Sequence, residues 1–175
     1  PPILETVLGG SPAKWDEQKS MMADRLRDWA TAAEQARVEI AIKAHVSSAV
    51  NSPERLLWLI EQVPSPAIQL AYDFSHFEVQ GIGMEESMRL LIPRTKFIHV
   101  KDSTGDVKKF RFLLPGAGRT DYVQYFSLLR RFRYSGPVCV EVSGQVSSQP
   151  DYEPIAAAKQ CFASLSTAMK AANNK

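Results

Sequence analysis

The chain has 175 residues, of which 45% are hydrophobic, and its 21 Lys and Arg against 19 Asp and Glu give a formal net charge of +2 at pH 7. A chain of this length and composition can bury a core, so it is one globular domain or part of one, and a disordered chain is excluded. The small, scattered charge argues against a nucleic-acid partner or an anionic membrane surface. A neutral or mildly anionic small molecule is the expected ligand.

The start of the chain shows no targeting segment. Pro1-Pro2-Ile3 has neither the basic nor the apolar region of a secretory leader, and no apolar run approaches the roughly 18 to 20 residues of a membrane span. The sequence therefore predicts a cytoplasmic protein without a membrane partner. Because the first residue is not Met, we expect further residues upstream, and a removed export signal stays open.

The two cysteines predict no disulfide. Cys139 lies in an apolar run, where a small buried side chain is expected, and Cys161 lies in a segment of helical periodicity.

Short apolar runs rich in β-branched residues alternate with segments of helical periodicity. The expected strands are Ile3 to Leu8, Val38 to Ala44, Ile68 to Tyr72, Lys96 to Val100 and Val138 to Val142, and the expected helices lie at about 13–36, 53–62, 84–92, 121–133 and 152–171. Repeated βα units of about 30 residues predict a parallel sheet with right-handed crossovers.

Such a sheet is either open and doubly wound or closed into a barrel. No Gly-x-Gly-x-x-Gly follows any expected strand, which disfavours an open dinucleotide-binding sheet. A complete barrel needs about 250 residues. We therefore expect residues 1–175 to form about the last five units, strands four to eight, of a (β/α)₈ TIM barrel. A missing N-terminal half or another copy of the chain would then cover the open edge.

Polar residues gather where the expected strands end. All three histidines, His45, His76 and His99, fall at or just after a strand end, Asp73 ends the third strand, and Glu141 lies in the fifth. The C-terminal ends of parallel strands open on one face, where polar residues are typically catalytic. Asp73, His99 and Glu141 are therefore predicted to converge on one cavity.

Glu141 stands between Val140 and Val142, and a buried carboxylate costs several kcal/mol unless it is paired or binds a cation. Two carboxylates and an imidazole suit a divalent metal such as Mn²⁺, Mg²⁺, Co²⁺ or Zn²⁺. The same residues also allow an ion-paired cluster without a metal.

Five motifs resemble those of the sugar-phosphate isomerase/epimerase superfamily of xylose isomerase-like TIM barrels, which also includes class II AP endonucleases. They are similar to that family's Glu-Pro-His strand end, Asp-x-x-His, His-x-Lys-Asp, Gly-Glu-Gly loop and final-strand Glu. In this chain they read Ile42-Lys43-Ala44-His45, Tyr72-Asp73-Phe74-Ser75-His76, Ile98-His99-Val100-Lys101-Asp102, Leu114-Pro115-Gly116-Ala117-Gly118 and Val140-Glu141.

The resemblance implies that Asp73, His99 and Glu141 ligate a metal and that His45 and His76 contact the substrate. The resemblance fails at one position.

Lys43 stands where the family has its fourth ligand, a Glu. An ammonium repels a metal ion. Lys43 therefore either takes the metal's place between Asp73 and Glu141, or turns aside while His45 completes the metal's shell.

The segment from Ser103 to Arg119 is long for a βα connection and mixes basic with apolar residues. It is predicted to be a loop that covers the substrate, and the alternative is a solvated loop whose apolar residues pack on the barrel rim. Lys101 and Arg111 are expected to bind the substrate, where a basic group suits a phosphate or carboxylate.

The leading hypothesis is an isomerase- or epimerase-like enzyme acting on a small-molecule sugar or sugar phosphate. Proton abstraction next to a carbonyl would use Glu141, with Lys43 or a divalent metal polarising the carbonyl and with His76 as a further catalytic group. Because the resemblance implies two opposed glutamates for epimerisation and Lys43 replaces one, a single-base isomerisation, a dehydration or a lyase step is favoured.

Two alternatives come from other function classes. One is a non-catalytic carbohydrate-binding barrel with a decayed metal site. The other is an AP endonuclease-like phosphodiesterase, which the three histidines and the low net charge disfavour.

Overall fold

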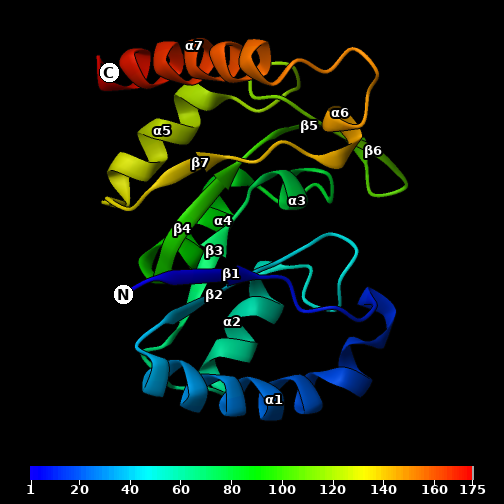
Figure 1. The fold of residues 1–175 in the computed structure, drawn as a ribbon, viewed down its shortest axis with the longest axis vertical. Helices are drawn as coiled ribbons and strands as arrows, with labels where there is room; N and C mark the ends of the chain where they lie inside the picture. Colours follow the sequence, from blue (N-terminus) through cyan, green and yellow to red (C-terminus); the bar gives the residue numbers. More distant parts are fainter. Residues whose placement is uncertain (175) are drawn as a thin grey trace.

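The computed structural model describes residues 1–174, and its centre is a parallel sheet whose strand order follows the chain, β1-β2-β3-β4-β7 (Figure 1). Each neighbouring pair is parallel. The strands are β1 (Ile3–Thr6), β2 (Glu39–Lys43), β3 (Ile68–Tyr72), β4 (Thr95–Val100) and β7 (Val138–Val140). All the expected strands are confirmed, most of them slightly shorter, and the sheet is the expected part of a barrel.

Helices cover the outer side of this half barrel, with α1 and α7 at opposite ends of it (Figure 1). Their starts follow the local sequence, since the side chains of Ser52 and Asp121 accept hydrogen bonds from the backbone N–H groups of Arg55 and Gln124. The helices are η1 (Pro12–Lys14), α1 (Trp15–Ala36), α2 (Pro53–Glu61), α4 (Met84–Leu91), η2 (Ile92–Arg94), α5 (Tyr122–Arg131) and α7 (Pro154–Asn173). They agree with the expected helices to within a few residues.

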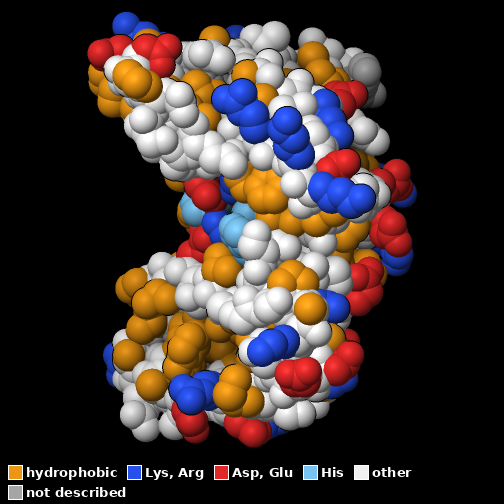
Figure 2. Space-filling view, turned by 90° about the vertical axis from the view of Figure 1, so that its right-hand side faces the viewer, with side chains coloured by type: hydrophobic (Ala, Val, Ile, Leu, Met, Phe, Trp, Pro, Cys, Tyr) orange, Lys and Arg blue, Asp and Glu red, His pale blue; other side chains and the backbone are white. Residues whose placement is uncertain are grey.

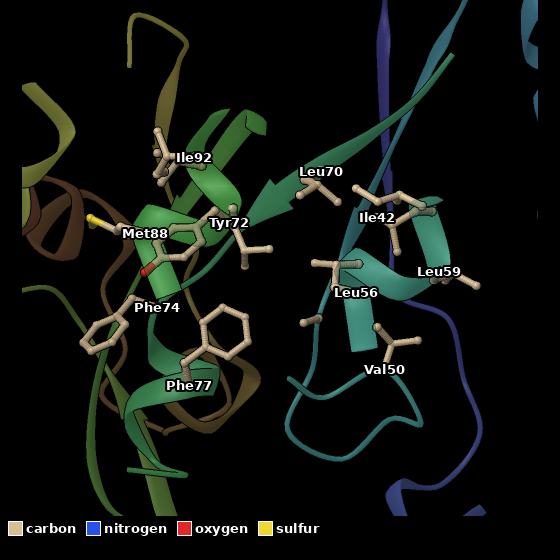
Figure 3. Close-up of a cluster of buried hydrophobic side chains, with 14 of the residues drawn as sticks. Ile42, Val50, Leu56, Leu59, Leu70, Tyr72, Phe74, Phe77, Met88 and Ile92 are labelled. Atoms are coloured by element: carbon tan, nitrogen blue, oxygen red, sulfur yellow. The ribbon is translucent and has the colours of Figure 1, made fainter. Parts of the chain in front are cut away.

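The core fills the space between the sheet and these helices (Figure 3). Ile42 and Leu70 from the strands and Leu56 from α2 are fully buried, and each such side chain contributes about 1.5–3 kcal/mol. Because side chains alternate along a strand, burying Ile42 toward the helices turns Lys43 toward the inner side of the half barrel.

The segment from Ser103 to Arg119 differs from the expected loop. It contains most of an antiparallel hairpin made of β5 (Asp102–Asp106) and β6 (Lys109–Leu113). Basic and apolar residues alternate along β6, which is the period of a strand and could have indicated it. The short helices α3 (Ser75–Glu78) and α6 (Gly144–Ser147) were also not expected.

β1 and β7 are the two edge strands of the sheet. Leu4 on β1 is 52% exposed and Val138 on β7 is 37% exposed. The expectation that Cys139 is buried is wrong, because its strand is an edge and the thiol is exposed. Cys139 and Cys161 are both free thiols. Within residues 1–174, no helix combines the length and the apolar character that a membrane crossing requires.

Candidate functional site

The C-terminal ends of all five strands bring charged side chains to the inner side of the half barrel. Glu5 comes from β1, Lys43 is the last residue of β2, Asp73 directly follows β3, His99 lies in β4, and Glu141 directly follows β7. Figure 2 shows histidine side chains beside acidic and basic ones in the hollow at the waist of the molecule. The predicted convergence of strand ends is thus present in the structure.

Lys43 lies at the centre of this cluster. Its Nζ atom is 2.7 Å from Oε2 of Glu141, 2.8 Å from Oε1 of Glu5 and 3.1 Å from Nδ1 of His99. Its side chain is only 6% exposed. The ammonium therefore faces carboxylates from both edge strands, and the expected orientation toward Glu141 is confirmed, whereas its direct partner on the other side is Glu5 rather than Asp73.

Lys101 is a second buried ammonium, two residues after His99. It forms an ion pair with Oδ2 of Asp73, lies 3.2 Å from Oε2 of Glu141 and 3.2 Å from Nε2 of His76. The centroid of the Phe112 ring, from the hairpin, lies 4.8 Å from Nζ of Lys101. The ammonium of Lys101 therefore forms ion pairs with the carboxylates of both Asp73 and Glu141.

Asp73 has little capacity left for another ligand. Its Oδ1 atom accepts hydrogen bonds from the backbone N–H and the hydroxyl of Ser75, at 3.1 and 2.6 Å, and Oδ2 binds Lys101. The α3 helix turn and Lys101 thus fix both carboxylate oxygens.

The electrostatics of the cluster set its protonation states. Burial opposes ionisation of Glu141, but the hydrogen bond from His99 and the charges of Lys101 and Lys43 outweigh it and hold the pKa of Glu141 far below its usual range. Burial also opposes the charged form of His99, yet the carboxylates of Glu141 and Glu5 beside its Nδ1 atom raise its pKa to about 9. At neutral pH, three cations (Lys43, Lys101 and His99) balance the three carboxylates.

The other two histidines are neutral at pH 7. Burial lowers the pKa of His76 to about 3, and burial together with the charges of Lys101 and Lys43 lowers the pKa of His45. The two rings lie 4.2 Å apart between centroids. His76 is 1% exposed, so it is linked to the cluster through buried contacts with Lys101 and Asp73.

Arg111 is not brought to the cluster. It is exposed on β6, where it alternates with Phe112, whose ring packs against His76 at 4.9 Å between centroids. The two side chains therefore point to opposite faces of the hairpin.

Glu5 is the site residue that sequence reasoning missed. It is a carboxylate that follows two apolar residues in a strand, a signal similar to the one that indicated Glu141. Its Oε2 atom lies 2.9 Å from Nδ1 of His99. The residues that contact Lys43 are thus Glu5, His99 and Glu141, and this set is called the Lys43 cluster below.

The arrangement does not fit a bound divalent metal. Within residues 1–174, no group of three or more His, Cys, Asp or Glu side chains is placed to hold one. The physical reason is that the ammonium of Lys43 stands among the nearest donors, while Asp73 is closed by Lys101 and Ser75. A like charge at that place repels a metal ion.

Comparison with known proteins identifies the family and the fold. Residues 4–165 match the family model of the xylose isomerase-like TIM barrel. The chain is 26% identical over 155 residues to an inosose dehydratase of Clostridium tetani, covering 80% of this chain and 51% of that protein. It is 24% identical over 138 residues to the L-ribulose-5-phosphate 3-epimerase UlaE of Salmonella typhi, covering 79% and 48%. The chain therefore spans about half the length of these curated relatives.

Solved structures show the same fold. A xylose isomerase domain protein from Planctomyces limnophilus aligns with a TM-score of 0.80 at 20% identity, covering 99% of this chain and 62% of that one. An IOLI protein with a bound zinc atom (TM-score 0.71, 21% identity, 99% and 60% covered) and a Mycobacterium smegmatis protein in complex with magnesium (0.70, 16%, 98% and 62%) are also similar. Divalent metals thus occur in proteins of this fold.

Proposed function

Because the chain belongs to the family of xylose isomerase-like TIM barrels, we propose that the barrel it helps to form moves a proton next to the carbonyl group of a sugar or sugar phosphate. The observation that carries the proposal is the 2.7 Å contact between Lys43 and Glu141 in a largely buried cluster. The contact supports the proposal because proton abstraction next to a carbonyl needs a base and a group that stabilises the developing charge. Both relatives described above are sugar-processing enzymes by name, which supports the same substrate class here.

Glu141 is the proposed base. Its ion pairs with Lys43, His99 and Lys101 all use Oε2, and the side chain is 30% exposed. We propose that Oε1 takes the proton from carbon. A carboxylate whose pKa is held far below its usual range is a weak base, so its basicity must rise when the substrate binds.

Lys43 can raise the basicity of Glu141 when the substrate binds. If its ammonium exchanges the bond to Glu141 for one to the carbonyl oxygen of the substrate, it polarises the carbonyl and weakens its hold on the base. Lys101 and the imidazolium of His99 remain near the developing negative charge and stabilise it. His76 is proposed to act through Lys101, and His45 to contact the substrate.

Two steps are proposed to follow proton removal, with Glu141 as the only base. In isomerisation, the protonated Glu141 returns the proton to the neighbouring carbon; in loss of water, it gives the proton to the departing hydroxyl group, which leaves as water. In Glu5, Oε1 contacts Lys43 and Oε2 contacts His99. Since both carboxylate oxygens are engaged, we assign Glu5 no proton transfer. No metal is given a role in this reaction, because the Lys43 cluster does not fit one.

Deuterium exchange tests the proposal. The protein is incubated in D₂O with a panel of ketoses, inososes and ketose phosphates, and NMR follows deuterium incorporation at the carbon next to the carbonyl. Incorporation is expected with at least one member of the panel and should fall at least about 100-fold in Glu141→Gln, because general-base catalysis contributes about 10²–10⁴-fold. A folded protein that exchanges no deuterium with any member contradicts the proposal.

A second candidate function follows from the charge balance. Since three cations and three carboxylates neutralise one another, the cluster also suits a barrel that binds carbohydrate without reacting. Saturable binding of a sugar with no exchange in D₂O would favour this second function.

A further inference from the structure

We propose that the ammonium of Lys43 occupies the place of a divalent cation, and that Glu5 is a latent metal ligand that this ammonium keeps from binding one. Neutralising Lys43, with no ligand added, should open a metal site made of Glu5, His99 and Glu141. The proposal is separate from the sugar reaction, because metal binding alone tests it.

The geometry around Lys43 is that of a cation held by two carboxylates, with the ring of His99 as its third neighbour. Two carboxylate oxygens and one imidazole nitrogen lie 2.7, 2.8 and 3.1 Å from a single Nζ atom. Metal ions such as Mn²⁺ and Zn²⁺ bind carboxylate oxygens and neutral imidazole nitrogens at about 2.0–2.2 Å, so a metal here would also displace the proton that His99 carries. The donors would therefore need to approach by only about 0.5–1 Å.

Glu5 supplies the evidence that the set is incomplete as it stands. Its Oε2 atom is buried and has no hydrogen-bond partner among the described residues, although Nδ1 of His99 lies 2.9 Å away. A buried carboxylate oxygen without a well-aligned donor is unfavourable. A cation at the position of Nζ could engage Oε1 or, after a small rotation, Oε2.

The place of Glu5 in the sheet explains how it can stand in for the missing ligand. β1 pairs with β2 in parallel, with Glu5 opposite Ala41, so Glu5 comes from the strand next to Lys43. Lys43 stands where the motif resemblance implies a carboxylate, and the carboxylate of Glu5, one strand away, contacts its ammonium. A metal site built this way uses a strand that the sequence motifs did not indicate.

Lys43→Met is the decisive variant, because Met has nearly the length of Lys and brings no charge or strong metal donor. Calorimetric titration with Mn²⁺ at pH 7 would compare the unaltered protein, Lys43→Met, and the double variant Glu5→Gln with Lys43→Met. Lys109→Met, at an exposed position of the hairpin, is the matched control. Circular dichroism follows folding with and without about 1 mM Mn²⁺, a concentration of the order needed to saturate a weak site.

We expect no tight binding to the unaltered protein or to Lys109→Met, and one equivalent bound by Lys43→Met at least about 100-fold more tightly. The double variant should lose at least about 10-fold of that affinity, since losing a ligand costs at least as much as losing a residue that supports one. Tight binding to the unaltered protein would overturn the proposal. Equal binding by the single and double variants would do the same, as would a Lys43→Met protein that stays unfolded when Mn²⁺ is present.

Discussion

Lys43 and Glu141 form a 2.7 Å ion pair across the half barrel, although 98 residues separate them in the sequence. The pair connects the end of β2 to the residue after β7, so the charged cluster links strands that share no backbone hydrogen bonds. Removing one charge from such a cluster leaves the others unpaired and buried, so the cluster affects stability as well as chemistry.

The first prediction concerns Lys101, whose side chain is 1% exposed and pairs with Asp73. Lys101→Met should lower the free energy of unfolding by about 3–5 kcal/mol, because it leaves Asp73 buried without its countercharge. Urea denaturation gives the measurement. The combined Asp73→Asn and Lys101→Met variant should lose less than the sum of the two single variants, and additive losses would show that the two residues are not coupled.

The second prediction concerns pH. Burial lowers the pKa of His99, but the adjacent carboxylates of Glu141 and Glu5 outweigh it and raise this pKa from an ordinary value near 6.5 to about 9. A group whose pKa is higher in the folded state stabilises the fold fully below its unfolded pKa and loses that effect as pH rises through the folded value. We therefore expect stability to fall between about pH 6.5 and 9, by an amount on the order of 2–3 kcal/mol.

Urea denaturation across this pH range checks the expectation. His99→Gln should remove most of the slope. An equally steep slope in that variant would assign the effect to another group.

The sequence predicted the parallel sheet well because each expected strand is a short apolar run between polar turns, and Ile42 and Leu70 are buried as those runs indicate. It predicted the strand-end residues for a related reason, since charged residues in apolar strands need partners. The same reasoning applied to Glu5 would have found it. The sequence did not indicate which charged residues pair with each other. The partner of Lys43 could be Asp73, Glu5 or Glu141, and the choice depends on strand positions that the whole sheet sets.

The third prediction concerns the hairpin that carries Phe112. Gly105 has φ +82°, and a Cβ atom there would overlap the carbonyl oxygen of Lys109. Gly105→Ala should destabilise the hairpin by about 1–3 kcal/mol, because both the backbone conformation and the overlap oppose a side chain. Gly81→Ala is the matched control. Gly81 has a similar φ of +76°, but a Cβ atom added there would meet no other atom within 4 Å.

Hydrogen exchange of the β5 and β6 amides provides the measurement. Exchange should accelerate in Gly105→Ala and stay unchanged in Gly81→Ala. Equal effects on both would mean that the close approach to Lys109 has no energetic weight.

The fourth prediction concerns the open edges of the sheet, β1 and β7. Strands of an eight-stranded barrel are spaced about 45° around its axis, so five cover about 225° and three more βα units fill the remainder. A second copy of this chain would need as large an arc again and would exceed a full turn. We therefore predict that residues 1–175 alone expose both edges and do not close into a dimer.

Light scattering and hydrogen exchange measure this directly. The expected result is a monomer whose β1 and β7 amides exchange faster than those of β3, which has a neighbour on both sides. A dimer with protected β1 and β7 amides would contradict the prediction and indicate that copies of the chain cover one another's edges.

The last prediction concerns Lys43→Glu, which places a carboxylate where the motif resemblance implies a fourth metal ligand. Without metal, this variant should be less stable than Lys43→Met, because the introduced carboxylate would face those of Glu5 and Glu141 around a single point. With Mn²⁺ or Co²⁺ the order should reverse, since the added carboxylate becomes a ligand and the metal binds only the folded state. Thermal unfolding of both variants at several metal concentrations separates the two effects. The melting temperature of Lys43→Glu should rise more steeply with metal concentration than that of Lys43→Met. If the unaltered protein already gains as much from the metal as Lys43→Glu does, then Lys43 does not stand at the metal position, and the alignment of β2 with the family motif is wrong.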